Sequence, residues 1–209
     1  MIQTPYVWVR SGVAGVLGVG CYILAITIPW PQTQTGTSVA LVVVSAWPIL
    51  SIVYAYGLCS FIAAEHDSAA NRLGLIFAIT GFATVLAMIV VQFAIKAAVP
   101  DITNDLDKQI TIALTRGLRM IDHGLDVAWD MLIGTALMFS GFAMRRRTGL
   151  RLPWAIPSVT LGAALIVLNA ATYPWPPADR GLFDVGPLIG IFVMALAARL
   201  AVLGWRSRA

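Results

Sequence analysis

Charged residues are scarce in this chain. Aspartate, glutamate, lysine and arginine make up 11% of its 209 residues, whereas soluble domains carry about 25%. Hydrophobic residues make up 59%, and the mean hydropathy is +0.83. A soluble fold of this size has too little polar surface to cover so much apolar area. The composition therefore excludes an ordinary soluble protein and predicts one integral membrane domain over residues 1–209.

Cysteine is also rare, and the common catalytic motifs are missing. Cys21 and Cys59 are the only cysteines, and both lie in apolar runs, so we interpret them as packing residues rather than zinc ligands. The sequence has no Gly-x-Ser-x-Gly nucleophile motif, no glycine-rich phosphate loop and no His-rich set for zinc or haem. These absences argue against an enzyme and predict no cofactor and no metal site.

Six apolar segments are long enough to cross a bilayer, which takes about 20 helical residues. Backbone groups in lipid must be hydrogen-bonded within their own segment, and runs of this length without two-residue alternation favour helices. The expected spans are residues 7–30, 38–64, 72–99, 125–144, 154–173 and 182–205. The predicted fold class is an all-α bundle of six transmembrane helices.

The basic residues predict the orientation. With the N-terminus inside, nine of the 14 lysines and arginines lie at inner span ends and five at outer ends, which follows the positive-inside bias. The link between the fourth and fifth spans alone carries Arg145, Arg146, Arg147 and Arg151. Because the number of spans is even, we expect both termini in the cytoplasm of a multi-pass protein of a bacterial inner (plasma) membrane. Basic residues at helix ends do not indicate nucleic-acid binding.

One polar constellation lies in residues 101–130. At about 100° per residue, its charged side chains fall on one side of a helix and its leucines on the other. The polar face holds Arg116, Arg119, Asp122, His123, Asp126 and Asp130, and the apolar face holds Leu114, Leu118, Ile121, Leu125 and Leu132. This pattern predicts an extracytoplasmic amphipathic helix that joins the third span to the fourth and continues into it.

Two interpretations of this polar face are open. In the first, the helix lies along the membrane surface and its charges are solvated, with Arg119 able to pair with Asp122. In the second, Asp126 and Asp130 enter the bilayer, where carboxylates usually face a bundle interior or a watery cavity. An outward-facing polar pocket would then form, with the candidate ligand-binding residues Asp126, Asp130, His123, Arg119, Gln92, Lys96, Asn169 and Tyr173, and with Asp184 nearby. Lys96 could instead extend to the interface.

Two further clusters have ordinary interpretations. Glu65, His66 and Asp67 lie in a short inner loop, which we interpret as a solvated turn rather than a metal site. In the first span, Ser11/Gly15 and Ala14/Gly18 are pairs of small residues four apart, which let helix backbones approach closely. We favour ordinary packing over a dimer face for these pairs.

The fourth and fifth spans also carry a family resemblance. A glycine-spaced helix from Gly134 to Gly141 is followed by an arginine-rich turn and then by Leu152-Pro153-Trp154. This arrangement resembles a bacterial six-helix membrane family known as domain of unknown function 4386. The resemblance implies a six-helix bundle and supplies no activity, cofactor or site residue.

These observations favour a protein that binds, senses or transports a small molecule or lipid through the outward-facing polar pocket. The alternative is a non-catalytic accessory or structural subunit that packs against other membrane proteins through its glycine-rich faces. The expected partners are the lipid bilayer, a lipid or small apolar ligand, and, in the alternative, a second copy of the chain or another membrane protein. No nucleic-acid partner is expected.

Overall fold

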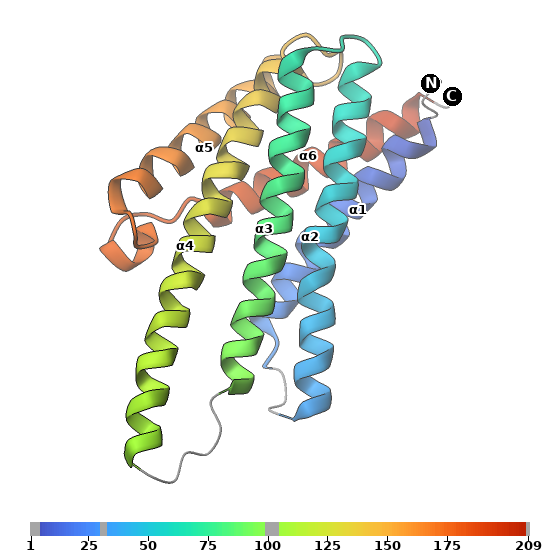
Figure 1. Ribbon diagram of the computed structural model, residues 1–209. Helices are drawn as coiled ribbons and strands as arrows, with labels where there is room; N and C mark the ends of the chain where they lie inside the picture. The colour runs from blue at the N-terminus through green and yellow to red at the C-terminus, as the bar shows by residue number, and fades with distance from the viewer. Residues whose placement is uncertain (1–4, 30–32, 99–104, 208–209) are drawn as a thin grey trace.

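The computed structural model describes residues 5–29, 33–98 and 105–207, and the side chains described within them exclude those of residues 34, 95–98 and 105–108. The described chain is helical throughout (Figure 1). Its elements are α1 (Pro5–Thr27), α2 (Gln34–Ala63), α3 (Ala69–Ala98), α4 (Asp105–Met144), α5 (Arg151–Thr172), the 3-10 helix η1 (Pro177–Arg180) and α6 (Gly186–Arg206). All six α-helices are long and apolar enough to cross a membrane. The prediction of an all-α fold with six candidate spans is confirmed.

Capping, proline and glycine residues account for several of the helix ends. The Thr33 hydroxyl accepts a hydrogen bond from the Gly36 N–H at 3.1 Å and caps the start of α2. The predicted sixth span included residues 182–185, but α6 begins only at Gly186. Pro187 lies in the first turn of α6. Backbone N–H groups in a first turn have no partner within the helix, so proline, which has no N–H, is tolerated there. Gly181 ends η1 with a positive φ of 72°, a conformation that favours glycine.

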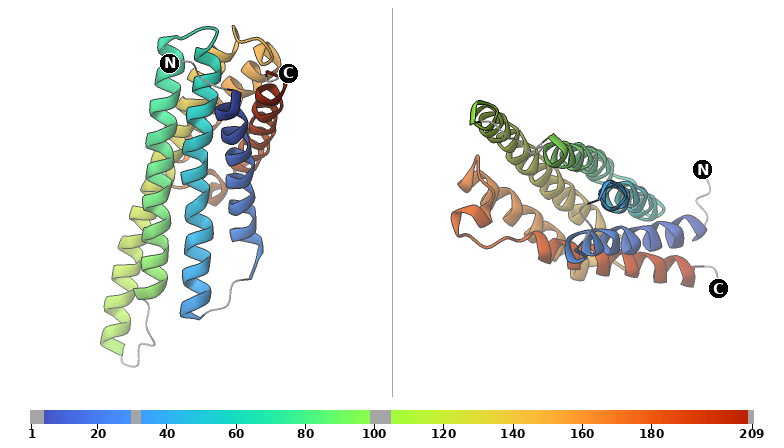
Figure 2. Two further views of the ribbon diagram at one scale, coloured as in Figure 1. Left: turned by 90° about the vertical axis from the view of Figure 1, so that its right-hand side faces the viewer. Right: turned by 90° about the horizontal axis from the view of Figure 1, so that it is seen from below.

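The helices form one bundle in which α3 packs against α2 and α4, α5 packs against α4, and α1 packs between α2 and α6 (Figures 1 and 2). Both chain ends lie at the same end of the bundle, together with the α2–α3 and α4–α5 connections (Figure 2). We call this the terminal end and the opposite one the far end. The α5–α6 connection lies about halfway between these two ends, because α5 and α6 are tilted and much shorter than α4 (Figure 1).

The small residues of α1 pack inside the chain. A Cβ added at Gly12 would lie 2.6 Å from the Ala197 carbonyl oxygen of α6, and one added at Gly15 would lie 2.8 Å from the Tyr54 ring of α2. A Cβ at Gly57 of α2 would overlap Ser11. Close approach of backbones is the role that small residues play at helix crossings. These residues therefore serve intramolecular packing, as the sequence interpretation favoured.

α4 is a single helix of 40 residues. At 1.5 Å per residue it is about 60 Å long, roughly twice the thickness of the hydrocarbon core. The predicted amphipathic segment and the fourth span are thus one continuous rod whose N-terminal part extends past the α5–α6 connection (Figure 1). Both faces of that part are exposed in the single chain, with Leu114 at 63% and Arg119 also exposed. Contact of its apolar face with lipid stays a prediction.

Candidate functional site

The candidate site is a polar cluster near the middle of α4, close to the α5–α6 connection. It is formed by side chains from four parts of the chain: Gln92 of α3, Asp122, Asp126 and Asp130 of α4, Asn169 of α5 and Asp184 just before α6. Asp130 lies 14 residues before the end of α4 at Met144, which is about 21 Å along the helix. A carboxylate at that position lies well inside a helix long enough to span a bilayer.

Asp130 and Asn169 form the centre of the cluster. The Asn169 side-chain amide donates from Nδ2 to Asp130 Oδ2 at 2.8 Å and to the Leu165 carbonyl oxygen at 3.0 Å. Asn169 is completely buried, at 0% exposure, while Asp130 is half-buried. Because both contacts are with acceptors, they fix which end of the amide is nitrogen. The structure therefore brings together two of the predicted site residues.

The side-chain carbonyl oxygen of Asn169 has no hydrogen-bond partner among the described residues. Oδ1 is buried and accepts no hydrogen bond within the described residues. A buried acceptor left unsatisfied costs roughly 1–3 kcal/mol, so such atoms are uncommon in native proteins. The centre of the cluster thus contains the Asp130 carboxylate and the unpaired acceptor Oδ1 of Asn169, whose Nδ2 donates to that carboxylate.

The other carboxylates extend the cluster along α4. Gln92 Nε2 lies 3.5 Å from Asp122 Oδ2, and the second oxygen of Asp122 is buried without a partner in the described chain. Asp126 interacts electrostatically with Asp122 and with Asp184. Asp184 accepts the Gly186 N–H at 2.8 Å and so orders the start of α6. Gln92 therefore joins the cluster through a contact with Asp122 rather than with Asp130.

The remaining predicted residues lie at the margin or outside. His123 packs edge-on against Trp175 of the α5–α6 connection, with ring centroids 5.4 Å apart, and the Arg180 guanidinium lies 5.4 Å from the same tryptophan ring. Tyr173 is 70% exposed. Arg119 is also exposed and forms no ion pair with Asp122 in the described structure. The side chain of Lys96 lies outside the described residues.

Three aromatic residues next to the cluster were not among the predicted site residues. Tyr22 of α1 lies against Trp47 of α2 with ring centroids 4.4 Å apart, and Trp47 meets Trp129 of α4 edge-on at 5.6 Å. Trp129 directly precedes Asp130, and Tyr22 interacts electrostatically with Asp130, Asp126 and Asp184. We call Tyr22, Trp47 and Trp129 the aromatic row. Tryptophan is enriched at span ends, where it anchors helices at the membrane interface. The only sequence signal for the aromatic row was therefore that Trp47 and Trp129 lie away from the predicted span ends.

A metal ion is a poor fit to the cluster. Among the described residues, no three His, Cys, Asp or Glu side chains approach one another closely enough to hold one. The aspartates of α4 are spaced by four residues, so successive carboxylates are one turn apart along the helix. The arrangement can offer several separate acceptors to an extended ligand, but not a compact set of ligands to one ion.

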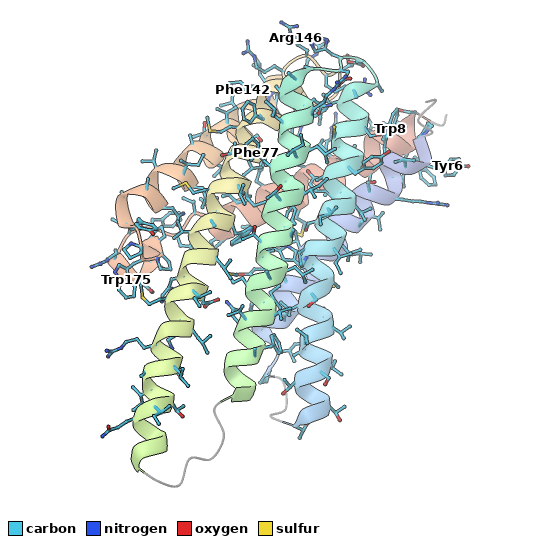
Figure 3. All side chains as sticks on the ribbon, in the orientation of Figure 1. Tyr6, Trp8, Phe77, Phe142, Arg146 and Trp175 are labelled. Atoms are coloured by element: carbon cyan, nitrogen blue, oxygen red, sulfur yellow. The ribbon has the colours of Figure 1, made fainter. Side chains whose placement is uncertain are left out.

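The terminal end holds a second polar site, and here the sequence interpretation was incomplete. Glu65 was interpreted as part of a solvated turn, yet its Oε1 pairs with Nη1 of Arg147 in the α4–α5 connection, and its Oε2 accepts the Thr148 N–H at 2.8 Å. The Arg147 guanidinium lies 3.7 Å from the centroid of the Phe61 ring. We call Glu65, Arg147 and Phe61 the clasp. It joins the α2–α3 connection to the α4–α5 connection, where Figure 3 labels the neighbouring Arg146.

The clasp combines a buried cation with a partly exposed anion. The Arg147 side chain is 9% exposed and the Glu65 side chain 39%. Burial lowers the pKa of Arg147, against the effect of the Glu65 carboxylate. For Glu65, desolvation is the largest single effect and raises the pKa, but the Thr148 N–H and the Arg147 charge together outweigh it, so the net pKa is lowered. This pattern is typical of a structural ion pair.

A cavity of about 60 Å³ lies in the middle of the bundle. Its lining comes from α2 to α6 and is almost entirely apolar, and Tyr54 contributes the one hydroxyl there that is buried without a partner in the described chain. A site that holds one water needs roughly 10–15 Å³ of such space. The cavity is thus large enough for a few waters, and its lining includes none of the cluster aspartates.

Comparison with known proteins found no related protein or structure. No family model matches the chain, and the searches of curated proteins and of solved structures also found no match. The resemblance to domain of unknown function 4386 therefore stays a prediction from the residues of the fourth and fifth spans.

Proposed function

We propose that this chain is a multi-pass protein of a plasma membrane that binds a small molecule or lipid at the polar cluster, as a receptor, sensor or transporter. The terminal end is placed in the cytoplasm, because it carries both termini and the arginine-rich α4–α5 connection, in keeping with the positive-inside bias. The polar cluster then lies toward the outer side, where a ligand from outside the cell would reach it.

The observation that supports binding is the pairing of a fully buried asparagine with a carboxylate inside a bundle of apolar helices. Placing a carboxylate at the centre of a membrane helix costs about 2.5–3.5 kcal/mol on insertion scales, and such residues typically mark substrate or ion pathways. Asn169 stabilises one oxygen of Asp130 but leaves its own Oδ1 without a donor. A purely structural pair would be expected to satisfy both side chains.

The test is the variant Asp130→Asn, which keeps the shape of the side chain and removes its charge. Thermal melting of the detergent-solubilised protein is measured alone and with a panel of cationic, anionic, zwitterionic and neutral small molecules and lipids. We expect at least one compound class to raise the melting temperature of the wild type and not that of Asp130→Asn. Asp67→Asn is the matched control, because it removes one carboxylate at the terminal end.

Two outcomes would contradict the proposal. In one, no compound class shifts the melting of the wild type, and Asp130→Asn melts as the wild type does. In the other, a compound stabilises wild type, Asp130→Asn and Asp67→Asn equally, which would place its binding site elsewhere on the protein.

A further inference from the structure

Among the described side chains, no lysine or arginine pairs with a carboxylate of the polar cluster, and the one basic group that acts on Asp126 is His123. Both ion pairs found in the described residues, Arg72–Asp67 and Arg147–Glu65, lie at the terminal end. At the cluster, Asp126 instead lies within electrostatic range of Asp122, Asp130 and Asp184, and Asp130 within range of Asp184. Like charges so arranged repel, and the repulsion grows as water is excluded. The cluster therefore has a deficit of positive charge.

The unpaired Oδ1 of Asn169 requires a hydrogen-bond donor from any ligand that binds at this position. The amide is completely buried, and its Nδ2 already donates to Asp130 and Leu165. Its Oδ1 lies on the same amide group and has no donor within the described chain. A group that satisfies this oxygen must carry an N–H or O–H donor, and a group that also neutralises the Asp130 carboxylate must be positively charged.

The aromatic row gives the cluster an apolar wall. Trp129 packs against the core that contains Leu165, whose carbonyl oxygen accepts from Asn169, and edge-on against Trp47, which in turn contacts Tyr22. Tyr22 lies within electrostatic range of Asp126, Asp130 and Asp184. Aromatic rings attract cations through their π faces and also pack against hydrocarbon. Carboxylates beside aromatic rings favour a ligand that is both cationic and apolar.

We propose that the ligand of the polar cluster is an organic cation, namely a protonated amine with an apolar body; this inference rests on the ligand-binding function proposed above. The ammonium group donates to the Asp130 carboxylate and to Asn169 Oδ1, and the apolar body lies against the aromatic row. The spacing of the α4 carboxylates disfavours a bare metal ion, because no three metal-ligating groups converge in the described structure.

The experiment uses four probes that share one phenyl body. They are 2-phenylethylammonium, its N,N,N-trimethyl analogue, neutral 2-phenylethanol and anionic 3-phenylpropionate, each titrated into the full-length protein in detergent micelles and followed by tryptophan fluorescence and calorimetry. We expect 2-phenylethylammonium to bind at least tenfold more tightly than the alcohol or the carboxylate. We expect the trimethyl analogue to bind more weakly than the primary ammonium, because it has no N–H for Asn169 Oδ1.

Variants connect the binding to the named residues. Asp130→Asn should abolish the preference for the ammonium, and Trp129→Leu should weaken its binding severalfold through loss of the aromatic wall. Asp67→Asn should leave the affinity unchanged, because Asp67 is exposed at the terminal end and pairs with Arg72. If Asp130→Asn is not recovered as a folded protein, Asp126→Asn and Trp129→Leu provide the same test.

The failures of the two proposals are distinguishable. If 3-phenylpropionate or 2-phenylethanol binds as well as the ammonium, and Asp130→Asn weakens that binding, the cluster is a ligand site but the cation inference is wrong. If no probe binds the wild type, the cation inference is also wrong, and the compound panel above decides whether the site binds anything.

A last control addresses Lys96 of α3 as an internal counter-ion. Melting of Lys96→Met, Asp130→Asn and the double variant forms a double-mutant cycle. Additive effects support an external cation, whereas strong coupling between the two positions would assign the positive charge to Lys96 and overturn the inference.

Discussion

The clasp allows a prediction whose direction is not obvious from exposure alone. Its arginine is nearly buried, with a side chain 9% exposed, while its glutamate is 39% exposed. Removing one partner of a fully buried ion pair costs about 3–5 kcal/mol, because the remaining charge stays buried without compensation. Solvent reaches Glu65, so we expect Glu65→Gln to lower the free energy of unfolding by a smaller amount, about 1–3 kcal/mol.

Arg147→Met should cost less than Glu65→Gln. Methionine removes the buried charge and keeps an apolar chain next to Phe61, although it loses the cation–π contact seen at 3.7 Å, which is worth roughly 0.5–2 kcal/mol. The carboxylate left behind can be hydrated and keeps its hydrogen bond from the Thr148 N–H. We therefore expect the change at the more exposed Glu65 to lower the free energy of unfolding more than the change at the buried Arg147.

The assay is thermal and denaturant unfolding in one detergent, followed by tryptophan fluorescence. For a chain of this size, each kcal/mol shifts the melting temperature by about 2–4 °C. The double variant Glu65→Gln/Arg147→Met should melt close to Arg147→Met alone, because the buried charge is gone in both. Asp67→Asn, in the exposed pair with Arg72, should melt as the wild type does. The reasoning is refuted if Arg147→Met is the more destabilised of the two single variants.

Two further predictions concern acidity and packing. The folded-state pKa of Glu65 is lowered, so its contribution to stability is present above the unfolded-state value of about 4.3 and is lost as pH falls through the folded-state value. Melting curves at decreasing pH should therefore show the gap between wild type and Glu65→Gln closing in the acid range; a constant gap would contradict this. A Cβ at Gly162 of α5 would lie 2.4 Å from the Gly134 carbonyl oxygen of α4, whereas nothing lies within 4 Å of a Cβ at Gly190. Gly162→Ala should cost about 1–3 kcal/mol and Gly190→Ala should be neutral or stabilising, as unfolding in detergent would measure; equal effects would show that α4 and α5 do not cross closely there.

The candidate site was predictable only in its acidic part. Helical periodicity placed Asp122, Asp126 and Asp130 on one face of α4, because that pattern depends on nearby residues alone. Asn169 was included for its similar depth, and the structure brings it to Asp130. The aromatic row was not predicted. Its members come from α1, α2 and α4, and local sequence patterns do not show which helices pack together.

The sequence by itself determined that this chain is helical and apolar over six segments, because hydrophobic run length is a local property that the bilayer thickness selects. It also placed the span ends within about four residues, apart from the fourth span, whose helix begins at Asp105 because the amphipathic segment is continuous with it. Only the tertiary structure decided which glycines face which helices, and that Glu65 reaches across the bundle end to Arg147. It alone joined Asp130 to Asn169 beside three aromatic rings. These contacts join residues far apart in the sequence, and they arise from how the helices pack together rather than from the preferences of any one helix.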